Sequence, residues 1–251
     1  MTDIIMHGCN GHMGRTITAI VENDDECRIV AGVDKNTGTE NRYPVFDDIS
    51  KCDVKADVII DFSSAVCCEG LLDYSQKTGI PIVLCTTGIS DAQKEKIIKA
   101  SGKVAILKSA NMSLGINVLS KLLKEAAQKL APEGFDIEIV EKHHNQKKDA
   151  PSGTALYLAD SMNEALDNKY DYVYDRSTRN ESRPKYEIGI SAVRGGNIPG
   201  DHDVIFAGGD EVITFSHRAY SKAVFGKGAV AAAKFLKGKG PGMYDMSDVI
   251  G

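Results

Sequence analysis

The residues best suited to chemistry lie in one short segment, 141–155, which reads Glu-Lys-His-His-Asn-Gln-Lys-Lys-Asp-Ala-Pro-Ser-Gly-Thr-Ala. His143 and His144 are adjacent, and Lys147 follows the first of them by four residues. Histidine titrates near neutral pH and can move a proton, while lysine adds a full positive charge. The segment therefore predicts a site that binds an anion and handles a proton.

Two elements must position these residues. Residues 135–141 alternate apolar and acidic side chains, which predicts a half-buried strand that ends where the histidines begin. Ser152 is a suitable N-cap for a following helix, whose apolar residues recur at helical spacing: Ala155, Leu156, Ala159, Met162 and Leu166. The amides of Gly153 and Thr154 then fall in the first turn, where helix N–H groups bind carboxylate or phosphate.

Two other interpretations of this segment compete with an anion site. Paired histidines near lysines also occur in solvated loops without a function. A metal site would need more ligands, but the segment has no cysteine, and lysines that repel a cation separate Asp149 from the histidines. The combination of acid, cation and helix start favours a functional site without a metal.

A second signal lies at the start of the chain. Residues 3–7 form a short apolar run, a glycine turn over 8–14 follows, and Ile17, Ile20 and Val21 recur at helical spacing. Glycines three apart allow a tight turn, the approach of amides to a pyrophosphate, and close packing of helix on strand. Such a turn also arises for steric reasons alone, so it needs support from elsewhere.

That support comes from the next predicted strand, 28–33, which ends at Asp34, twenty residues after Gly14 (34 − 14). A carboxylate at this position accepts hydrogen bonds from ribose hydroxyls, which favours NAD. Lys35 follows at once and could instead pair with the 2′-phosphate of NADP, so both coenzymes stay open.

Further apolar runs at 57–63, 81–85 and 104–107 are separated by polar segments of helix length, as in buried parallel strands. Ligands of a doubly wound sheet lie at the carboxyl edge of such strands. We therefore expect the nicotinamide half of the coenzyme to contact two loops: Cys85, Thr86 and Thr87 in one, and Ser109, Ala110, Asn111 and Met112 in the other.

The pattern changes after Met112. A predicted helix over 116–130 precedes the histidine segment, and the strand candidates 186–193, 204–207 and 212–217 are joined by short polar loops. The chain thus predicts a Rossmann-like doubly wound parallel sheet of the α/β class, plus an α+β domain with a mixed or antiparallel sheet.

Three remaining segments complete the prediction. Residues 168–183 are polar and are expected to form a mobile or partner-covered connection. Residues 223–236 are rich in alanine and predict a helix, and the glycine-rich residues 238–251 predict an irregular end.

Composition restricts the function further. The 251 residues carry a formal net charge of −5 without a basic block, which argues against nucleic acid as a partner. No apolar stretch reaches the roughly eighteen residues that span a bilayer, so no membrane contact is expected, and the first residues lack the features of a signal peptide. The six cysteines show no paired framework. We therefore expect a cytoplasmic protein with reduced thiols.

The histidine segment and the glycine turn together closely resemble those of the dihydrodipicolinate reductases, also called 4-hydroxy-tetrahydrodipicolinate reductases, of bacterial lysine biosynthesis. The strongest motif of that family, Glu-x-His-His-x-x-Lys-x-Asp-Ala-Pro-Ser-Gly-Thr-Ala, matches 141–155 without a gap. The resemblance runs essentially end to end and includes the G-x-x-G-x-M-G turn, the Thr-Thr-Gly and Ser-Ala-Asn loops, and Arg194-Gly195-Gly196.

This resemblance implies an enzyme of diaminopimelate and lysine biosynthesis. Hydride passes from NADH or NADPH to C4 of a small cyclic dicarboxylate, and water is lost from the 4-hydroxy substrate. The residue matching His143 is the proton donor or acceptor, and the one matching Lys147 is a proton donor. His144, Gly153 and Thr154 match substrate-binding positions, and we add their neighbour Ser152 to this group.

The resemblance also implies the coenzyme contacts and the architecture. Gly8, Cys9, Asn10, Gly11, His12 and Met13 match the turn on the pyrophosphate, with Asp34 and Lys35 at the ribose. Residues 1–112 and 221–251 would form the dinucleotide-binding domain, and residues 113–220 the substrate-binding and oligomerisation domain of a homotetramer. NADH or NADPH is the expected cofactor, and no metal is expected.

Two other functions remain as alternatives. The first is a different NAD-dependent reductase on the same scaffold, for instance one acting on an amino-acid-derived aldehyde. It would require an activated cysteine or another substrate arrangement in the second half, and no cysteine occurs after residue 85. The second is a non-catalytic dinucleotide sensor, which has no need of His143 and Lys147 beside an anion pocket.

Overall fold

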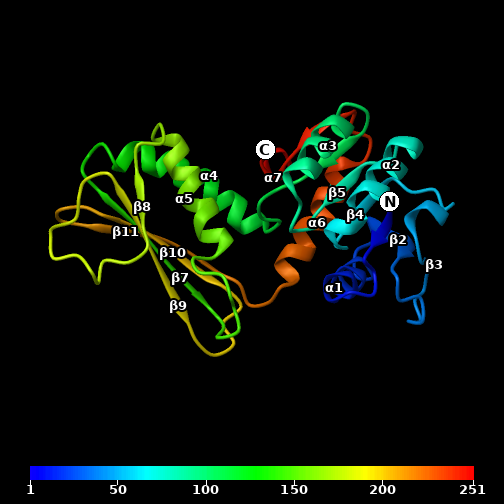
Figure 1. Cartoon of the computed structure of the whole chain (residues 1–251), viewed down its shortest axis with the longest axis horizontal. Helices are drawn as coiled ribbons and strands as arrows, with labels where there is room; N and C mark the ends of the chain where they lie inside the picture. Colours follow the sequence, from blue (N-terminus) through cyan, green and yellow to red (C-terminus); the bar gives the residue numbers. More distant parts are fainter. The chain divides into compact units, whose positions relative to one another are not determined.

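The chain folds into two units in the computed structural model, which describes all 251 residues. One unit contains both ends of the chain, residues 1–114 and 223–251, and we call it the terminal unit. The other contains residues 115–222, and we call it the central unit. Figure 1 labels most of the helices and strands of both units.

The terminal unit is built on a parallel sheet of seven strands in the order β12-β6-β5-β4-β1-β2-β3. The strands are β1 (Thr2–His7), β2 (Cys27–Val33), β3 (Val45–Phe46), β4 (Val58–Asp61), β5 (Ile82–Leu84), β6 (Ala105–Leu107) and β12 (Gly242–Tyr244). The helices are α1 (His12–Val21), α2 (Cys68–Thr78), α3 (Asp91–Ser101), α6 (Ala223–Leu236) and α7 (Met246–Ile250).

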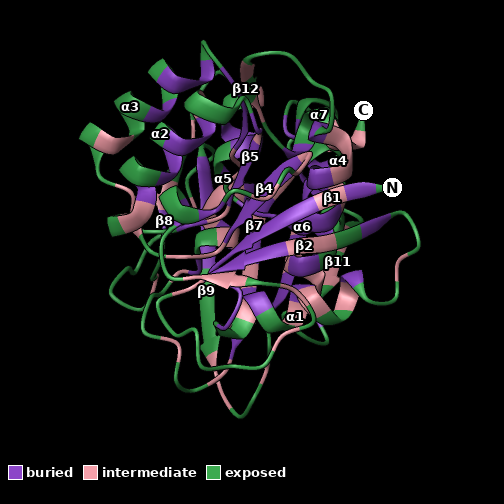
Figure 2. Ribbon diagram, turned by 90° about the vertical axis from the view of Figure 1, so that its right-hand side faces the viewer, coloured by how far each residue is buried: buried purple, intermediate pink, exposed green.

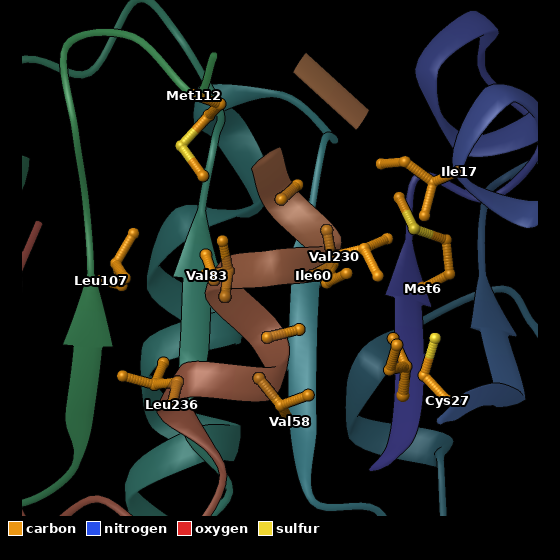
Figure 3. Close-up of a cluster of buried hydrophobic side chains, with 14 of the residues drawn as sticks. Met6, Ile17, Cys27, Val58, Ile60, Val83, Leu107, Met112, Val230 and Leu236 are labelled. Atoms are coloured by element: carbon orange, nitrogen blue, oxygen red, sulfur yellow. The ribbon is translucent and has the colours of Figure 1, made fainter. Parts of the chain in front are cut away.

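Helices cover both faces of this sheet. Successive strand residues point to opposite faces, so Ile4 and Met6 pack with α1 and α6, whereas Ile5 packs with α2 and α3. Figure 3 shows side chains of the first cluster, which come from the strands, from α1 and α6, and, for Met112, from the loop after β6. Because both faces are covered, β1 and β4 are almost entirely buried (Figure 2).

The direction of winding reverses at β1. From β1 the chain continues to β2 and β3 on one side, and then to β4, β5 and β6 on the other. In a doubly wound sheet, such a reversal leaves a crevice beyond the carboxyl ends of the central strands, where ligands bind. The loops after β1, β2 and β4 are therefore the expected borders of a coenzyme site.

The central unit contains a mixed sheet in the order β11-β10-β7-β9-β8. Its strands are β7 (Asp136–His143), β8 (Asp171–Val173), β9 (Glu187–Arg194), β10 (Asp201–Ala207) and β11 (Val212–Arg218). β10 pairs antiparallel with β7 and β11, whereas β9 pairs parallel with β7 and β8. Two helices, α4 (Leu114–Leu130) and α5 (Gly153–Ala165), accompany the sheet (Figure 1).

Apolar residues of α4 and α5 pack against one face of this sheet. On β7 the face carries Ile137 and Ile139, and on β10 it carries Phe206, all fully buried. Burial of such a side chain contributes about 1.5–3 kcal/mol, so these residues fix which face of each strand points inward. Glu141 and His143 continue the inward row of β7 and are consequently buried as well.

The predicted combination of a doubly wound parallel sheet with a mixed sheet is confirmed. The predicted ends of the central strands were inexact: β7 reaches His143 instead of stopping at residue 141, and β10 begins at Asp201. No helix of the structure combines the length and apolar character needed to cross a membrane.

The sequence prediction missed secondary structure in two segments. Residues 168–183, predicted as a mobile or partner-covered connection, contain β8, and Arg176 and Arg183 bind the carboxylate of Glu138 on β7. Residues 238–251 contain β12 and α7 in place of an irregular end. Both missed strands have three residues, which is too short for alternation to show.

Candidate functional site

The loop after β1 turns sharply into α1. Gly8 has a φ of +83°, and a Cβ on it would lie 2.6 Å from the carbonyl oxygen of Phe62. A Cβ on Gly14 would lie 2.2 Å from the carbonyl oxygen of Gly8. Neither position has space for a side chain, so the approach of helix to strand requires glycine at both.

A crevice of about 340 Å³ lies at this edge of the parallel sheet. The loops after β1, β2 and β4 border it, and its lining includes Gly8, Gly11, Asp34, Lys35, Ser63 and Ser64. α1 begins there without a side-chain cap, because its N-cap residue is Gly11. The dipole and N–H groups of a helix start favour an anion such as a pyrophosphate.

Asp34 follows the end of β2 beside this crevice. Its Oδ2 accepts a hydrogen bond from the Asn10 amide at 3.0 Å, and its Oδ1 accepts one from the Asn36 amide at 3.0 Å. A carboxylate has about four acceptor positions, so Asp34 can hold the turn and still accept from a ribose hydroxyl. Lys35 is exposed next to it.

Part of the predicted pyrophosphate turn faces the interior. Cys9 is buried, and this burial, together with the charge of Asp34, raises the pKa of its thiol to about 11. Asn10 is also buried, and its side-chain amide donates to a backbone carbonyl of the loop after β2. The turn therefore offers mainly its backbone, with the side chains of His12 and Met13 at least partly exposed.

The two loops predicted to contact the nicotinamide follow β5 and β6, and neither lines this crevice. Thr86 is buried, and burial raises the pKa of the neighbouring Cys85 thiol well above its usual range. Exposure of the remaining residues varies: Thr87 and Ala110 are exposed, Ser109 is half-buried, and Asn111 and Met112 are buried.

Asp61, at the end of β4, holds several loops of this edge together. Its Oδ2 accepts from the Thr86 hydroxyl at 2.6 Å, and its Oδ1 accepts from the Ser63 hydroxyl at 2.6 Å. His7 Nδ1 lies 2.9 Å from Oδ1, which is an ion-pair distance without hydrogen-bond geometry. Asp61 is 1% exposed, so water does not compete for these contacts, and they fix the loops after β4 and β5.

In the central unit, a second buried carboxylate lies beside the predicted acid. His143 Nδ1 is 2.6 Å from Glu141 Oε2. Arg194, at the end of β9, donates Nη1 to Oε2 and Nη2 to Oε1, both at 2.7 Å. The Ser152 amide donates to Oε1 at 3.0 Å. Glu141 therefore joins two strands and the start of α5.

The charge state of Glu141 follows from these contacts. Burial raises the pKa of its carboxyl, but the hydrogen bonds from Arg194, His143 and Ser152 outweigh this effect, and the pKa lies below its ordinary value. Glu141 is consequently ionised at neutral pH and acts only as an acceptor.

Lys147 lies in the loop between β7 and α5. Its ammonium lies 2.8 Å from both carboxylate oxygens of Asp149 and holds the pKa of that carboxyl below its usual value. Arg194 Nη2 also donates to the backbone carbonyl of Asp149 at 2.7 Å, which links this loop to the Glu141 cluster. His144 is half-buried, and its amide donates to the carbonyl of Ile198 at 2.8 Å.

Ser152 is the N-cap of α5, as the sequence predicted. Its Oγ accepts from the Ala155 amide at 3.1 Å and lies 2.9 Å from His202 Nε2. The amide of Ser152 binds Glu141, and its hydroxyl binds Ala155 and His202. Both groups are thus engaged within the unit, which suits a residue that supports the site better than one that binds the substrate directly. Gly153, the first residue of α5, is exposed, and Thr154 is half-buried.

His202 on β10 completes the cluster. Its ring meets the ring of His143 edge to face, with centroids 5.2 Å apart. Burial, and secondly the charge of His143, lower the pKa of His202 to about 4, so its ring is neutral at neutral pH. No group of three or more His, Cys, Asp or Glu side chains is placed to hold a metal ion.

Sequence reasoning gave no role to Glu141, Arg194 or His202. Glu141 could have been found by continuing the alternation of β7 one step beyond Ile139. Arg194 and His202 lie 53 and 50 residues from their partners. The resemblance included Arg194 in the Arg-Gly-Gly motif without a role, and no local pattern marks His202.

Comparison with known proteins finds matches to one family along the whole chain. Residues 2–112 match the family model described as dihydrodipicolinate reductase, N-terminus, and residues 115–250 match the model of its C-terminus. A relative from Caldanaerobacter subterraneus subsp. tengcongensis, named 4-hydroxy-tetrahydrodipicolinate reductase, is 54% identical over 250 residues, which cover 100% of this chain and 98% of the relative.

Two solved structures share the fold. The dipicolinate-bound dihydrodipicolinate reductase from Paenisporosarcina sp. TG-14 has a TM-score of 0.83 at 23% identity, covering 100% of this chain and 99% of that one. An oxidoreductase from Agrobacterium radiobacter in complex with NAD+, L-tartaric acid and magnesium has a TM-score of 0.60 at 11% identity, covering 99% and 92%.

Proposed function

The chain belongs to the dihydrodipicolinate reductase family, and we propose that it catalyses the reaction for which its relatives are named. It reduces 4-hydroxy-tetrahydrodipicolinate to tetrahydrodipicolinate in the biosynthesis of diaminopimelate and lysine. The substrate gains a hydride at C4 and loses its hydroxyl as water. The observation that carries this proposal is the buried Glu141–His143 pair, held by Arg194, within the fifteen-residue motif of the family.

The terminal unit fits a dinucleotide. Gly8 and Gly14 allow the tight turn, the crevice lies at the reversal of the sheet, and the uncapped start of α1 suits a pyrophosphate. When bound, the reduced nicotinamide supplies the hydride. Asp34 suits the ribose of NADH and Lys35 suits the phosphate of NADPH, so we propose that the enzyme uses both coenzymes.

The central unit fits a small dianion. Lys147 supplies a cation, and the start of α5 at Gly153 supplies N–H groups and the positive end of the helix dipole. A substrate carboxylate would compete with Asp149 for the ammonium of Lys147. The dipicolinate bound to the Paenisporosarcina reductase is a dicarboxylate of this kind, which supports the assignment.

The chemistry also needs an acid. A hydroxyl leaves as water only after it takes a proton, and a ring that accepts hydride is activated when its nitrogen is protonated. His143 and Lys147 are the groups of this cluster that can supply a proton. His144, Gly153 and Thr154 are assigned to substrate binding, with Ser152 supporting them as the helix cap.

We extend the proposal to assembly and location. The face of the central sheet away from α4 and α5 exposes residues such as Val193 and Val212, and we propose that such surfaces join four copies of the chain. All six cysteines are free, which suits the reducing cytoplasm. Light scattering coupled to gel filtration tests the tetramer directly.

The function is tested by following the absorbance of the reduced coenzyme, with substrate generated in place from pyruvate and aspartate semialdehyde. We expect turnover with NADH and with NADPH. His143→Gln or Lys147→Ala should lower turnover by about 10²-fold or more, the usual scale for a positioned acid, with the fold intact. Lys148→Ala, which removes an exposed lysine of the same loop, is the matched control and should keep turnover unchanged.

Two results would contradict the proposal in different ways. A wild-type protein without turnover on this substrate would refute the reaction. Full turnover in both variants would leave the reaction standing but remove the acid roles of His143 and Lys147.

A further inference from the structure

We propose that Glu141 is the positioning residue of this site: its carboxylate fixes the His143 ring so that Nε2 exchanges the proton, and couples that ring to the start of α5. This inference rests on the proposed function and adds Glu141 to the residues that serve the reaction. Glu141 need not touch the substrate, since it acts through His143.

The geometry determines which nitrogen of His143 is available. Glu141 is fully buried and ionised, so it can only accept hydrogen bonds. The 2.6 Å contact to Oε2 therefore requires a proton on His143 Nδ1. In the neutral ring this leaves Nε2 as the acceptor, and in the protonated ring it leaves the Nε2 proton as the one that can be given away.

The surroundings of Nε2 agree with this orientation. A Cβ on Gly200 would lie 3.0 Å from Nε2, so a side chain at that position would occupy the space next to the reacting atom. The His143 side chain is 10% exposed, whereas Glu141 is 0% exposed. The ring therefore keeps a small exposed part, whereas the group that orients it has none.

The same carboxylate connects the acid to the proposed anion site. Oε1 accepts the amide of Ser152, the N-cap of α5, while Oε2 accepts His143. Arg194 grips both oxygens and reaches the carbonyl of Asp149, whose side chain pairs with Lys147. A displacement of Glu141 would thus move the proton donor and the carboxylate-binding groups together.

A purely structural ion pair would not require this arrangement. A buried pair stabilises a fold no better than well-packed apolar residues of similar size, so burial alone gives Glu141 no advantage. What an apolar residue cannot do is accept the Nδ1 proton of His143. Three charged or titratable groups of the sheet face His143: Glu141 on its own strand, Arg194 from β9 and His202 from β10. Lys147 lies on the following loop, and its charge also acts on His202.

The first test compares Glu141→Gln with Asp203→Asn. Asp203 pairs with Lys142 at 2.6 Å on the outward face of the same sheet, so its variant removes a carboxylate without touching the cluster. We expect Glu141→Gln to lower kcat by about 10²-fold and leave the KM for coenzyme unchanged, since the coenzyme site is in the other unit. Asp203→Asn should keep the wild-type kcat.

The pH profile separates positioning from general damage. Loss of the Glu141 carboxylate disfavours the protonated His143 ring. As the pH is raised, the activity that depends on this acid should therefore be lost about one pH unit earlier in Glu141→Gln than in the wild type. A folded variant with wild-type kcat and an unchanged profile would overturn the proposal. So would a loss of kcat with an unchanged profile, because that result indicates structure alone.

The tautomer of His143 gives a test that does not depend on activity. Nitrogen NMR of the wild-type protein should show the neutral ring protonated at Nδ1. The double variant Glu141→Met with Arg194→Met removes the acceptor without leaving a buried charge, and should show the proton at Nε2. A wild-type ring protonated at Nε2 would overturn the proposal even if the variants do not fold. Absence of turnover in wild type would instead refute the proposed function.

Discussion

At the scale of single residues, one buried carboxylate organises each unit. Asp61 binds hydroxyl groups from the loops after β4 and β5, and Glu141 binds groups from β7, β9 and the start of α5. Exposed ion pairs contribute only about 0–1 kcal/mol, because water competes for each partner. Asp61 and Glu141 are at most 1% exposed, so their partners have no such competitor and are held in fixed positions.

Asp34 provides a prediction at this scale. If Asp34 binds the ribose as proposed, Asp34→Asn removes the charged acceptor there, so the KM for NADH should rise by about tenfold, the scale of one charged hydrogen bond. The KM for NADPH should stay constant or fall, because a charge that repels the 2′-phosphate is gone. Asp73→Asn, an exposed position on α2, is the control. Equal changes in both KM values would argue against Asp34 as the selecting residue.

At the scale of elements, the sequence predicted β7 well because its alternation is strict. The inward row Ile137, Ile139, Glu141 and His143 is readable once the strand is extended by two residues. Five of the parallel strands, β1, β2, β4, β5 and β6, were equally clear from their apolar runs, whereas β3 and β12 are too short to show one. What could not be predicted is which residues from distant strands reach this row. Sheet pairing brings Arg194 of β9 to Glu141, and it brings His202 of β10 close enough to contact Ser152.

The turn between β1 and α1 gives a prediction for an element. Gly8→Ala places a Cβ against the backbone of Phe62 at a positive φ, and should lower the free energy of unfolding by more than the roughly 1–3 kcal/mol of backbone strain alone. Gly79→Ala is the matched control, because Gly79 has a φ of +74° with nothing within 4 Å of the added Cβ. Thermal melts compare the two variants. Equal losses would show that the close approach to Phe62 has no cost.

At the scale of the whole molecule, the two units share a chain but differ in how their sheets are covered. The parallel sheet carries helices on both faces, whereas α4 and α5 cover one face of the mixed sheet. This difference explains why the first half of the sequence shows continuous apolar runs and the second half shows alternation. The family is shown by the sequence models and relatives, and the architecture agrees with the fold of a solved member.

Acid should destabilise the molecule through His202. Its pKa lies at about 4 in the folded state, against about 6.5 for an unfolded histidine. Between these values the unfolded chain binds a proton that the folded chain does not, so the free energy of unfolding should decrease as pH falls, by about 3 kcal/mol in total. Above pH 6.5 this contribution is constant.

Urea unfolding at several pH values measures this effect. His202→Gln removes the titrating ring, so the difference in unfolding free energy between wild type and variant should shrink as the pH is lowered from 6.5 to 4. Parallel pH dependences for the two proteins would show that His202 does not contribute.

The terminal unit contains residues from both ends of the chain, and this sets the order in which the two units can fold during translation. Helix α6 supplies Ala229, Val230 and Leu236 to the face of the sheet that carries Met6 and Ile60. While the ribosome is still translating the intervening residues, α1 can already pack on that apolar face, but the part that α6 covers stays open. The central unit, which is one continuous segment, therefore has all its residues first. The terminal unit, whose first strands are made earliest, is the last to be completed.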